Sequence, residues 1–332
     1  MPLTQLNFQP GLDTENTPTG AEGRWVDGDK IRFRKGLPQK IGGWTKFSAD
    51  YYVGVGRALE QWYSLDGSRY EALGTDRKVY VYQSGDNQDI TPIRSTDALV
   101  NAITTTNTSN VVTISDTSHG ALLGDFVTLS SVSTDVGGIS AATLDGEYEI
   151  LSISNVNAYT IQSSATANAN TGPTANCTAT YQLNIGPSIQ TFGYGWGAST
   201  WGASTWGTPR STSSVILDAR LWSINNWGED LVITEKDGGT YEWDLSGGMS
   251  TNRAEAIANA PTTSTLSLIS TETRHVICMG TELTIGDSTT FDKMFIRWSD
   301  QENYNFWTPN VTNSAGSQRI AGGSEIRCAR PA

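Results

Sequence analysis

Short apolar runs separated by turn residues follow one another along most of this chain. The clearest case lies in residues 221–248, where the apolar run Leu231–Thr234 is followed by the turn residues Lys236–Gly239 and a second short run, Thr240–Trp243. Two such runs separated by Asp-Gly predict a β-hairpin. Because one hairpin cannot bury its apolar face alone, we expect further copies of this unit.

Two other stretches show the same pattern. In Leu59–Gln83, the runs Tyr70–Gly74 and Val79–Tyr82 flank a turn at Thr75–Lys78, and His275–Trp307 holds the runs HVICMG and MFIRWSD around a turn-rich gap. The sequence therefore predicts an all-β fold with three blade-like units of a β-propeller, in residues 51–94, 211–248 and 275–323. Three blades are too few to close a ring of about 4–8. We therefore expect either a truncated product or an open assembly that other chains complete.

Between the first two units the composition shifts to Ser, Thr, Asn and Ala, with almost no Lys or Arg, over residues 95–180. Turn residues separate several clear strands there, which predicts a small antiparallel β-sandwich or barrel inserted into a propeller-like domain made of residues 51–94 and 181–332. The expected strands are Asn110–Ser115, Phe126–Leu129, Gly146–Ser154 and Ala158–Gln162. Two stretches are expected to be connections: Ala165–Ala179, a flexible linker, and residues 249–274.

Residues 1–50 form an opening arm in which Lys30–Arg34 alternates charged and apolar side chains, as a strand with one buried face does. The segment from Leu37 to Trp44 is rich in turn residues. We take Arg32, Arg34 and Lys35 as candidate contacts with a neighbouring subunit, with solvated strand charges as the plainer alternative.

A WGAST repeat in residues 193–207 fits neither the helix nor the strand period, so we expect a glycine-rich loop that displays Trp196, Trp201 and Trp206. Tryptophan is enriched at interfaces, which favours packing between or within subunits. Stacking against sugars is the alternative for these three indoles.

The net charge of −12 argues against duplex binding through neutralised phosphates, although it is compatible with a surface that DNA passes without adhering. The three cysteines, Cys177, Cys278 and Cys328, are widely spaced and are expected to be small buried residues or free thiols, as in a reducing compartment. We find neither a secretory signal nor an apolar run long enough for a membrane-spanning helix.

Catalytic patterns are absent from the sequence. His119 and His275 lack HxxxH or HxH partners, and the chain holds no nucleophile elbow, phosphate-binding loop or dinucleotide-binding motif. The neighbouring carboxylates are expected to form turns or lie on the solvated surface rather than act as a glycosidase pair; these are Asp27 with Asp29, Glu229 with Asp230, and Asp300 with Glu302. We therefore expect no catalytic, cofactor or metal site, and no enzyme.

Several stretches together resemble one family, the tail nozzle proteins of short-tailed bacteriophages, also called phage stabilisation or tail accessory proteins. The stretches are residues 11–44, DITPI (89–93), GWGASTWGASTWG (195–207), LWSINNWGEDLVI (221–233), YEWD (241–244) and IRWSDQENYNFWTP (296–309). The resemblance implies a virion protein, made in the host cytoplasm, that forms a hexameric ring below the portal and adaptor and also meets tail fibre proteins. Such a ring closes the tail channel and conducts DNA during ejection without binding it specifically.

Two other functions stay open at this point. A receptor- or glycan-binding tail module would use the tryptophan loop and the inserted domain to contact sugars. A polysaccharide-degrading enzyme is the third alternative, and the missing active-site pattern counts against it.

Overall fold

The computed structural model describes residues 8–43, 45–46, 48–190, 218–246, 248–249 and 252–330. The chain divides into two compact units, Met1–Ala49 and Asp50–Ala332. In the described residues, helix is limited to one turn of α-helix, α1 (Ala141–Leu144), and one 3₁₀ turn, η1 (Ser288–Thr290). The all-β prediction is therefore confirmed.

In the first unit, β1 (Ile31–Arg34) and β2 (Leu37–Lys40) form an antiparallel hairpin. The turn residues Lys35 and Gly36 both have positive φ, 52° and 81°, as a two-residue hairpin turn of type I′ requires. Behind the hairpin, Trp25 lies 6.5 Å from the ring of Phe33. The expected strand at Lys30–Arg34 is confirmed, but Leu37–Lys40 is a strand rather than part of a turn, because a proline is tolerated in an edge strand.

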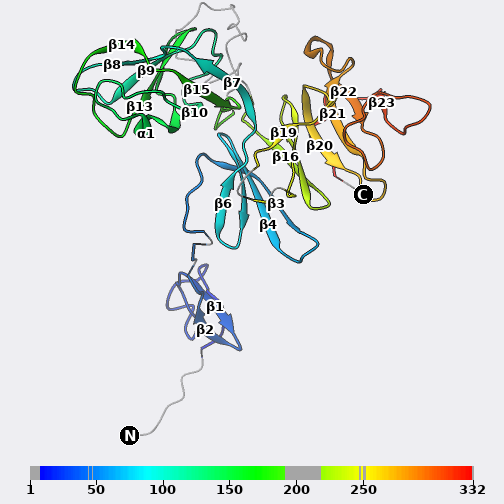
Figure 1. Ribbon diagram of the computed structural model, residues 1–332. Coiled ribbons are helices and arrows are strands. Elements are labelled where there is room, and N and C mark those ends of the chain that lie inside the picture. The colour runs from blue at the N-terminus through cyan, green and yellow to red at the C-terminus, as the bar shows by residue number, and fades with distance from the viewer. Residues whose placement is uncertain are drawn as a thin grey trace, which may run out of the picture. The chain divides into compact units, whose positions relative to one another are not determined.

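Three four-stranded antiparallel sheets follow one another in the second unit (Figure 1), each with its strands in chain order. We call them the first, second and third sheets. The first comprises β3 (Gly56–Tyr63), β4 (Arg69–Thr75), β5 (Val79–Gln83) and β6 (Asp86–Asp89); the second β16 (Trp222–Trp227), β17 (Asp230–Glu235), β18 (Thr240–Trp243) and β19 (Glu255–Ala256); the third β20 (Ser264–Ile269), β21 (Val276–Glu282), β22 (Phe291–Trp298) and β23 (Gly316–Arg319). These are the expected blade-like units.

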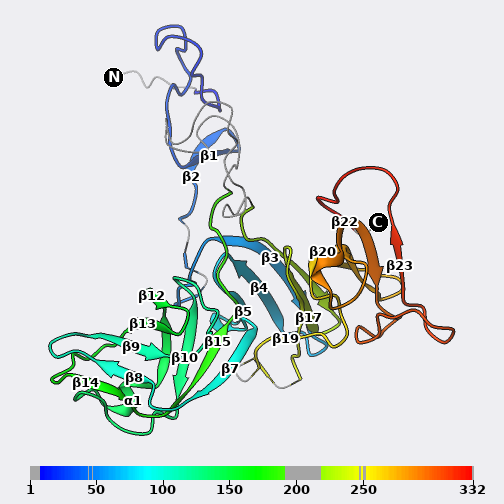
Figure 2. The same ribbon diagram turned by 90° about the horizontal axis from the view of Figure 1, so that it is seen from above.

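The second sheet packs between the other two because neighbouring residues of a strand face opposite sides (Figure 2). Ile233 belongs to an apolar cluster with Trp62 and Tyr70 of the first sheet. Val232 belongs to a different cluster, with Val276 of the third sheet. Consecutive sheets therefore bury one face each against the next, and β16 contacts both β3 and β20.

One expected connection, residues 249–274, contains both β19 and β20. The strand β20 was missed because its polar residues are hydroxyl side chains that hydrogen-bond inside the protein. Ser267 is buried, and its Oγ accepts a hydrogen bond from Thr234 Oγ1 at 2.7 Å. A serine- and threonine-rich composition therefore concealed a buried strand.

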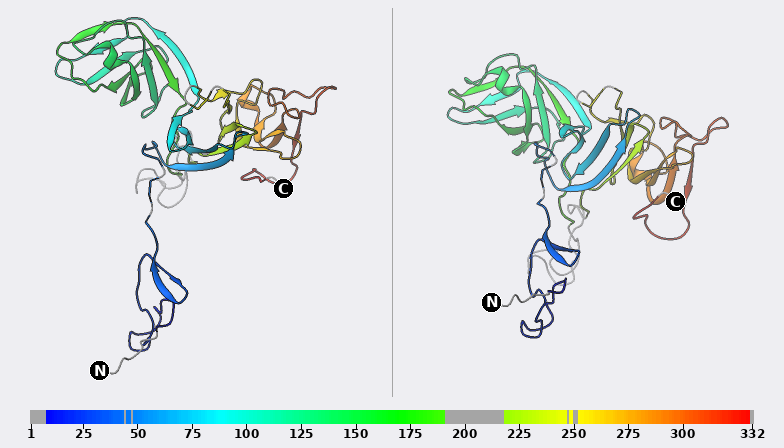
Figure 3. Two further views of the ribbon diagram at one scale, coloured as in Figure 1. Left: turned by 60° about the horizontal axis from the view of Figure 1, so that its bottom comes forward. Right: turned by 90° about the horizontal axis from the view of Figure 1, so that it is seen from below.

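Residues 95–180, which we call the insert, form most of two facing sheets (Figure 3). Their apolar cluster draws only on residues 99–181. The four-stranded sheet has the order β11-β10-β15-β7 and the five-stranded sheet β12-β13-β9-β8-β14. The bounds are β7 (Ile93–Leu99), β8 (Ile103–Thr105), β9 (Val111–Ser115), β10 (Phe126–Ser130), β11 (Gly146–Glu149), β12 (Ser152–Asn155), β13 (Ala158–Gln162), β14 (Thr171–Thr174) and β15 (Cys177–Gln182). The division at residues 95 and 180 stays a prediction.

Two details of the insert differ from expectation. The supposed linker Ala165–Ala179 contains β14 and the start of β15, and Cys177 and Ala179 are buried between the two sheets. Both side chains are small and buried, although the composition of the stretch resembles a linker. The single strand expected at Gly146–Ser154 is two strands, β11 and β12, in different sheets, with the fully buried Ile150 at the passage between them.

Candidate functional site

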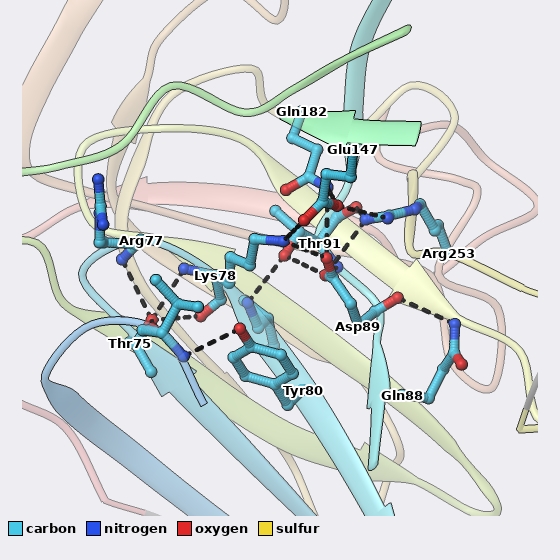
Figure 4. Close-up of polar contacts among 12 residues, drawn as sticks. Thr75, Arg77, Lys78, Tyr80, Gln88, Asp89, Thr91, Glu147, Gln182 and Arg253 are labelled. Carbon is cyan, nitrogen blue, oxygen red and sulfur yellow. Dashed lines mark hydrogen bonds and ion pairs between the residues drawn. The ribbon is translucent and has the colours of Figure 1, made fainter. Parts of the chain in front are cut away.

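A cluster of charged side chains lies where the first sheet, the second sheet and the insert meet (Figure 4). Lys78 directly precedes β5, and Asp89 ends β6. Glu147 comes from β11 and Gln182 ends β15, while Arg253 lies two residues before β19. Segments that are far apart in the sequence thus bring two cations and two carboxylates together, and we call these five residues the ion-pair cluster.

Each carboxylate of the ion-pair cluster faces both cations. Lys78 Nζ lies 2.9 Å from Asp89 Oδ2 and also contacts Glu147 Oε1. Arg253 Nη1 lies 3.2 Å from Asp89 Oδ1, and its Nη2 lies 3.6 Å from Glu147 Oε2. The two positive charges of Lys78 and Arg253 thus equal the two negative charges of Asp89 and Glu147, and the cluster has no net charge.

The environment of Lys78 makes these pairs important for stability. Its side chain is 4% exposed, and its Nζ also lies 4.2 Å from the ring centre of Phe126 in the insert. Removal of one partner from a buried ion pair costs about 3–5 kcal/mol, because the remaining charge is left without compensation. The cluster is therefore sensitive to changes that leave the buried Lys78 without a partner, whereas Glu147 and Arg253 are partly exposed, at 35% and 28%.

Asp89 is fixed from its own loop as well. The backbone N–H and the hydroxyl of Thr91 donate to Asp89 Oδ1 at 2.9 and 2.6 Å. Burial alone raises the pKa of Asp89, but Arg253, Lys78 and the Thr91 hydrogen bond outweigh burial and hold this pKa below its ordinary value. The carboxylate therefore stays charged in mildly acidic solution.

Gln182 completes the cluster. Its Nε2 donates to Glu147 Oε2 at 2.6 Å and lies 3.3 Å from Asp89 Oδ2. Its Oε1 is buried and has no hydrogen-bond partner among the described residues. A buried acceptor without a partner costs about 1–3 kcal/mol of folding free energy. The burial of Gln182 Oε1 in the ion-pair cluster therefore lowers the stability of the folded protein locally.

The residues proposed from the sequence lie elsewhere. Arg32, Arg34 and Lys35 are exposed on the hairpin of the first unit, and Arg32 Nε donates to Gln39 Oε1 at 3.2 Å. Three further candidates, Trp196, Trp201 and Trp206, lie outside the described residues. A role for either set in subunit contact stays a prediction.

Both histidines hydrogen-bond to backbone groups. His119 Nδ1 accepts from the N–H of Ala121 at 3.1 Å, so its Nε2 donates to the carbonyl oxygen of Asn155 at 3.2 Å. His275 Nδ1 lies 2.8 Å from the carbonyl oxygen of Ser299. Within the described part of the chain, no group of three or more potential ligands could hold a metal ion.

Three of the carboxylates singled out in the sequence, Glu229, Asp230 and Asp300, accept hydrogen bonds from backbone N–H groups. Glu229 Oε1 accepts from the N–H of Leu65 at 2.7 Å, and Asp230 Oδ1 from that of Leu245 at 3.0 Å. Asp300 Oδ1 accepts from the N–H of Ser314 at 2.8 Å. These contacts hold turns and loops in place.

Sequence reasoning missed the ion-pair cluster. The one local signal was Asp89-Ile-Thr91, because an aspartate two residues before a threonine often fixes a turn through its side chain. The partners Glu147 and Arg253 follow at separations of more than fifty residues, and no local pattern marks them.

No family model matches this chain, and no curated protein matches it. Among solved structures, a phage phi92 endosialidase is similar at 13% identity with a TM-score of 0.24, over 87% of this chain and 41% of that chain. The chain thus spans less than half the length of the matched protein. A TM-score this low carries no argument about fold or function.

The expectation that the chain is not an enzyme is corrected in one respect: the matched protein is an enzyme by its name, so the absence of activity is not stated of this chain. That expectation is therefore withdrawn. The similarity establishes no enzymatic activity for this chain either. Among the described residues, no helix has the length and apolar character needed to cross a membrane.

Proposed function

We propose that this chain is a structural subunit of a phage tail, and more specifically of a homo-oligomeric nozzle ring through which DNA leaves the particle. A portal or adaptor ring and tail fibre proteins are its proposed neighbours. The quoted resemblance supports this proposal, since its stretches include residues that hold the sheets together. Asp89 and Thr91 of DITPI fix the ion-pair cluster, and Trp227 of LWSINNWGEDLVI packs against the third sheet.

The observation that carries the proposal is the separation of charge along the chain. Six of the 22 Lys and Arg residues lie in residues 30–46, a stretch without Asp or Glu, whereas the whole chain has a net charge of −12. These cations belong to the first compact unit, and the hairpin there exposes Arg32, Arg34 and Lys35. The remainder of the chain is therefore more acidic than the net charge implies.

This distribution suits a ring that DNA must pass. Phosphates that pair with cations release counterions and bind tightly, so a basic channel would retain DNA. An acidic wall avoids such retention, while the basic hairpin is left to contact an acidic surface of the next subunit. Complementary charges at the rim of an interface mainly set register and association rate.

Charge reversal on the hairpin tests the proposal. The unchanged protein should form rings at low salt, visible by negative-stain electron microscopy and by light scattering after size exclusion. Arg32→Glu with Arg34→Glu should reduce assembly while the melting temperature stays within a few degrees, because exposed charges contribute little to stability. The matched control is Arg69→Glu with Arg319→Glu, which changes the net charge equally at exposed positions of the second unit.

Two results would contradict the proposal. One is a monomer under all salt conditions and concentrations tested. The other is tight, salt-sensitive binding of duplex DNA that is lost in the hairpin variant alone, since the hairpin would then be a DNA site.

A further inference from the structure

The insert and the three sheets have separate apolar cores. The cluster of the insert draws only on residues 99–181, whereas the two clusters of the sheets draw on residues 62–90 and 222–307. No residue belongs to both groups. Each body therefore has its own apolar core, although the buried ring of Phe126 in the insert faces Arg77 and Lys78 beside the first sheet.

Polar contacts hold the two bodies together. Besides the ion-pair cluster, Arg77 Nη2 lies 2.5 Å from Glu149 Oε1 and donates to the carbonyl oxygen of Gly124 at 3.1 Å. In the segment that follows β15, the N–H of Ile185 donates to Asp125 Oδ1 at 2.8 Å, and Asn184 Nδ2 donates to the carbonyl oxygen of Gly120 at 3.1 Å. Charge and hydrogen bonding thus set the orientation of the insert.

The covalent connection is narrow. The chain enters the insert along β7 and leaves it along β15, and these two strands pair with each other, with Ile93 opposite Gln182. The register shifts between Tyr181 and Gln182, where the ladder reaches the first sheet. The two segments that connect the insert to the sheets, which we call the crossings, therefore lie side by side, next to the ion-pair cluster.

We propose that the ion-pair cluster is a latch that holds the insert against the first sheet, and that its loss frees the insert to turn as a folded body about residues 92–94 and 182–184. This inference does not depend on the proposed channel role. The unpartnered Oε1 of Gln182 favours opening, because in the open state solvent can donate to it.

Charge balance explains why a single change opens the latch. Asp89 faces Lys78, Arg253 and Thr91 from the first and second sheets, and Glu147 and Gln182 from the insert. Tyr80, on the strand beside it, is neutral. Without Lys78, two carboxylates face each other with Arg253 as their shared cation.

Acid should open the latch while salt should have little effect. The depressed pKa of Asp89 means that its contribution is present above the ordinary pKa of an aspartate and is lost as pH falls through the lowered value. Screening by salt acts mainly on exposed charges, and Lys78 is buried. For an ion pair at the surface, salt would have a larger effect than mild acid.

Hydrogen exchange measured by mass spectrometry on the whole chain tests the latch. In Lys78→Met, amides of residues 90–95 and 182–186 should exchange at least ~100-fold faster, as expected for a broken buried pair, while β9 and β13 keep their protection. The control Arg69→Gln removes an exposed cation of the same sheet and should leave both regions unchanged.

If Lys78→Met does not fold, Glu147→Gln serves as a milder opening variant with the same expected pattern. Two results would overturn the proposal: unchanged exchange at both crossings in the opening variants, or a uniform rise that includes β9 and β13. The second would show that the insert and the sheets unfold as one unit.

Discussion

Trp222 of the second sheet donates its indole N–H to the carbonyl oxygen of Thr75 in the first sheet, at 2.6 Å. The same ring lies against Gly74, where an added Cβ would come within 2.7 Å of Trp222 Cδ1. A glycine next to the end of β4 is thus required because a tryptophan of the next sheet packs directly on its backbone.

Gly74→Ala should therefore destabilise the protein by about 1–3 kcal/mol, the usual cost of overpacking a well-filled interface. Urea denaturation followed by tryptophan fluorescence measures this effect. Gly42→Ala is the control, since that site has open space around it and should change the free energy of unfolding by less than about 0.5 kcal/mol. Equal effects of both changes would mean that Trp222 moves aside without cost.

Tyr181→Phe should destabilise the insert by about 1–3 kcal/mol. The hydroxyl of Tyr181 donates to Asp116 Oδ2 at 2.5 Å, and the variant leaves that buried carboxylate without this donor. The comparison is Tyr63→Phe, where the residue is 59% exposed and the loss should be small. Chemical denaturation followed by circular dichroism gives both values, and a neutral Tyr181→Phe would show that Asp116 finds another donor.

The three cysteines should differ sharply in reactivity towards a thiol reagent such as Ellman's. Cys328 is exposed, whereas Cys177 and Cys278 are buried, and burial raises the pKa of each buried thiol to about 11. At neutral pH we expect one rapid equivalent in the native protein and two more only in denaturant, because the thiolate is the reactive form. Cys328→Ser should abolish the rapid phase; a rapid phase that survives it would place a buried thiol within reach of solvent.

Alkaline solution should unfold the protein before several tyrosines ionise. Burial raises the pKa of Tyr80, Tyr159, Tyr181 and Tyr241 well above the ordinary value. A raised tyrosine pKa stabilises the folded state fully below the ordinary value of about 10, and this contribution is lost as pH rises towards the folded value. Tyrosinate absorbance should therefore increase together with the loss of the circular dichroism signal, and reversible ionisation of every tyrosine in the folded protein would contradict this.

Local patterns were enough to predict the hairpins. The pair β17–β18 around Asp237-Gly238 was found because alternation and a tight turn occur within a dozen residues. The strands β15 and β20 were missed because Ala, Ser and Thr are read as linker residues unless their burial is known. In β15, Ala179 is fully buried between two sheets, and in β20 the buried hydroxyl of Ser267 bonds to Thr234.

The ion-pair cluster could not be predicted for a different reason. Its members come from three sheets, and only the packing of one sheet on another decides that Arg253 meets Asp89. An acidic chain offers many carboxylates, and no local pattern distinguishes Glu147 from the others. The candidate contacts on the hairpin were predictable as a basic stretch, but what they touch depends on a second chain.

The pairing of Ile93 with Gln182 has an evolutionary consequence. Because paired residues of an antiparallel ladder lie about 4.5–5.5 Å apart, the insert occupies the place of a single turn between two strands. Recombination could replace it with any folded cassette whose ends are equally close, and the three sheets would keep their cores. Asp89 would then face both Lys78 and Arg253 alone, so compatible cassettes should carry an acidic residue near their junction to balance the second cation.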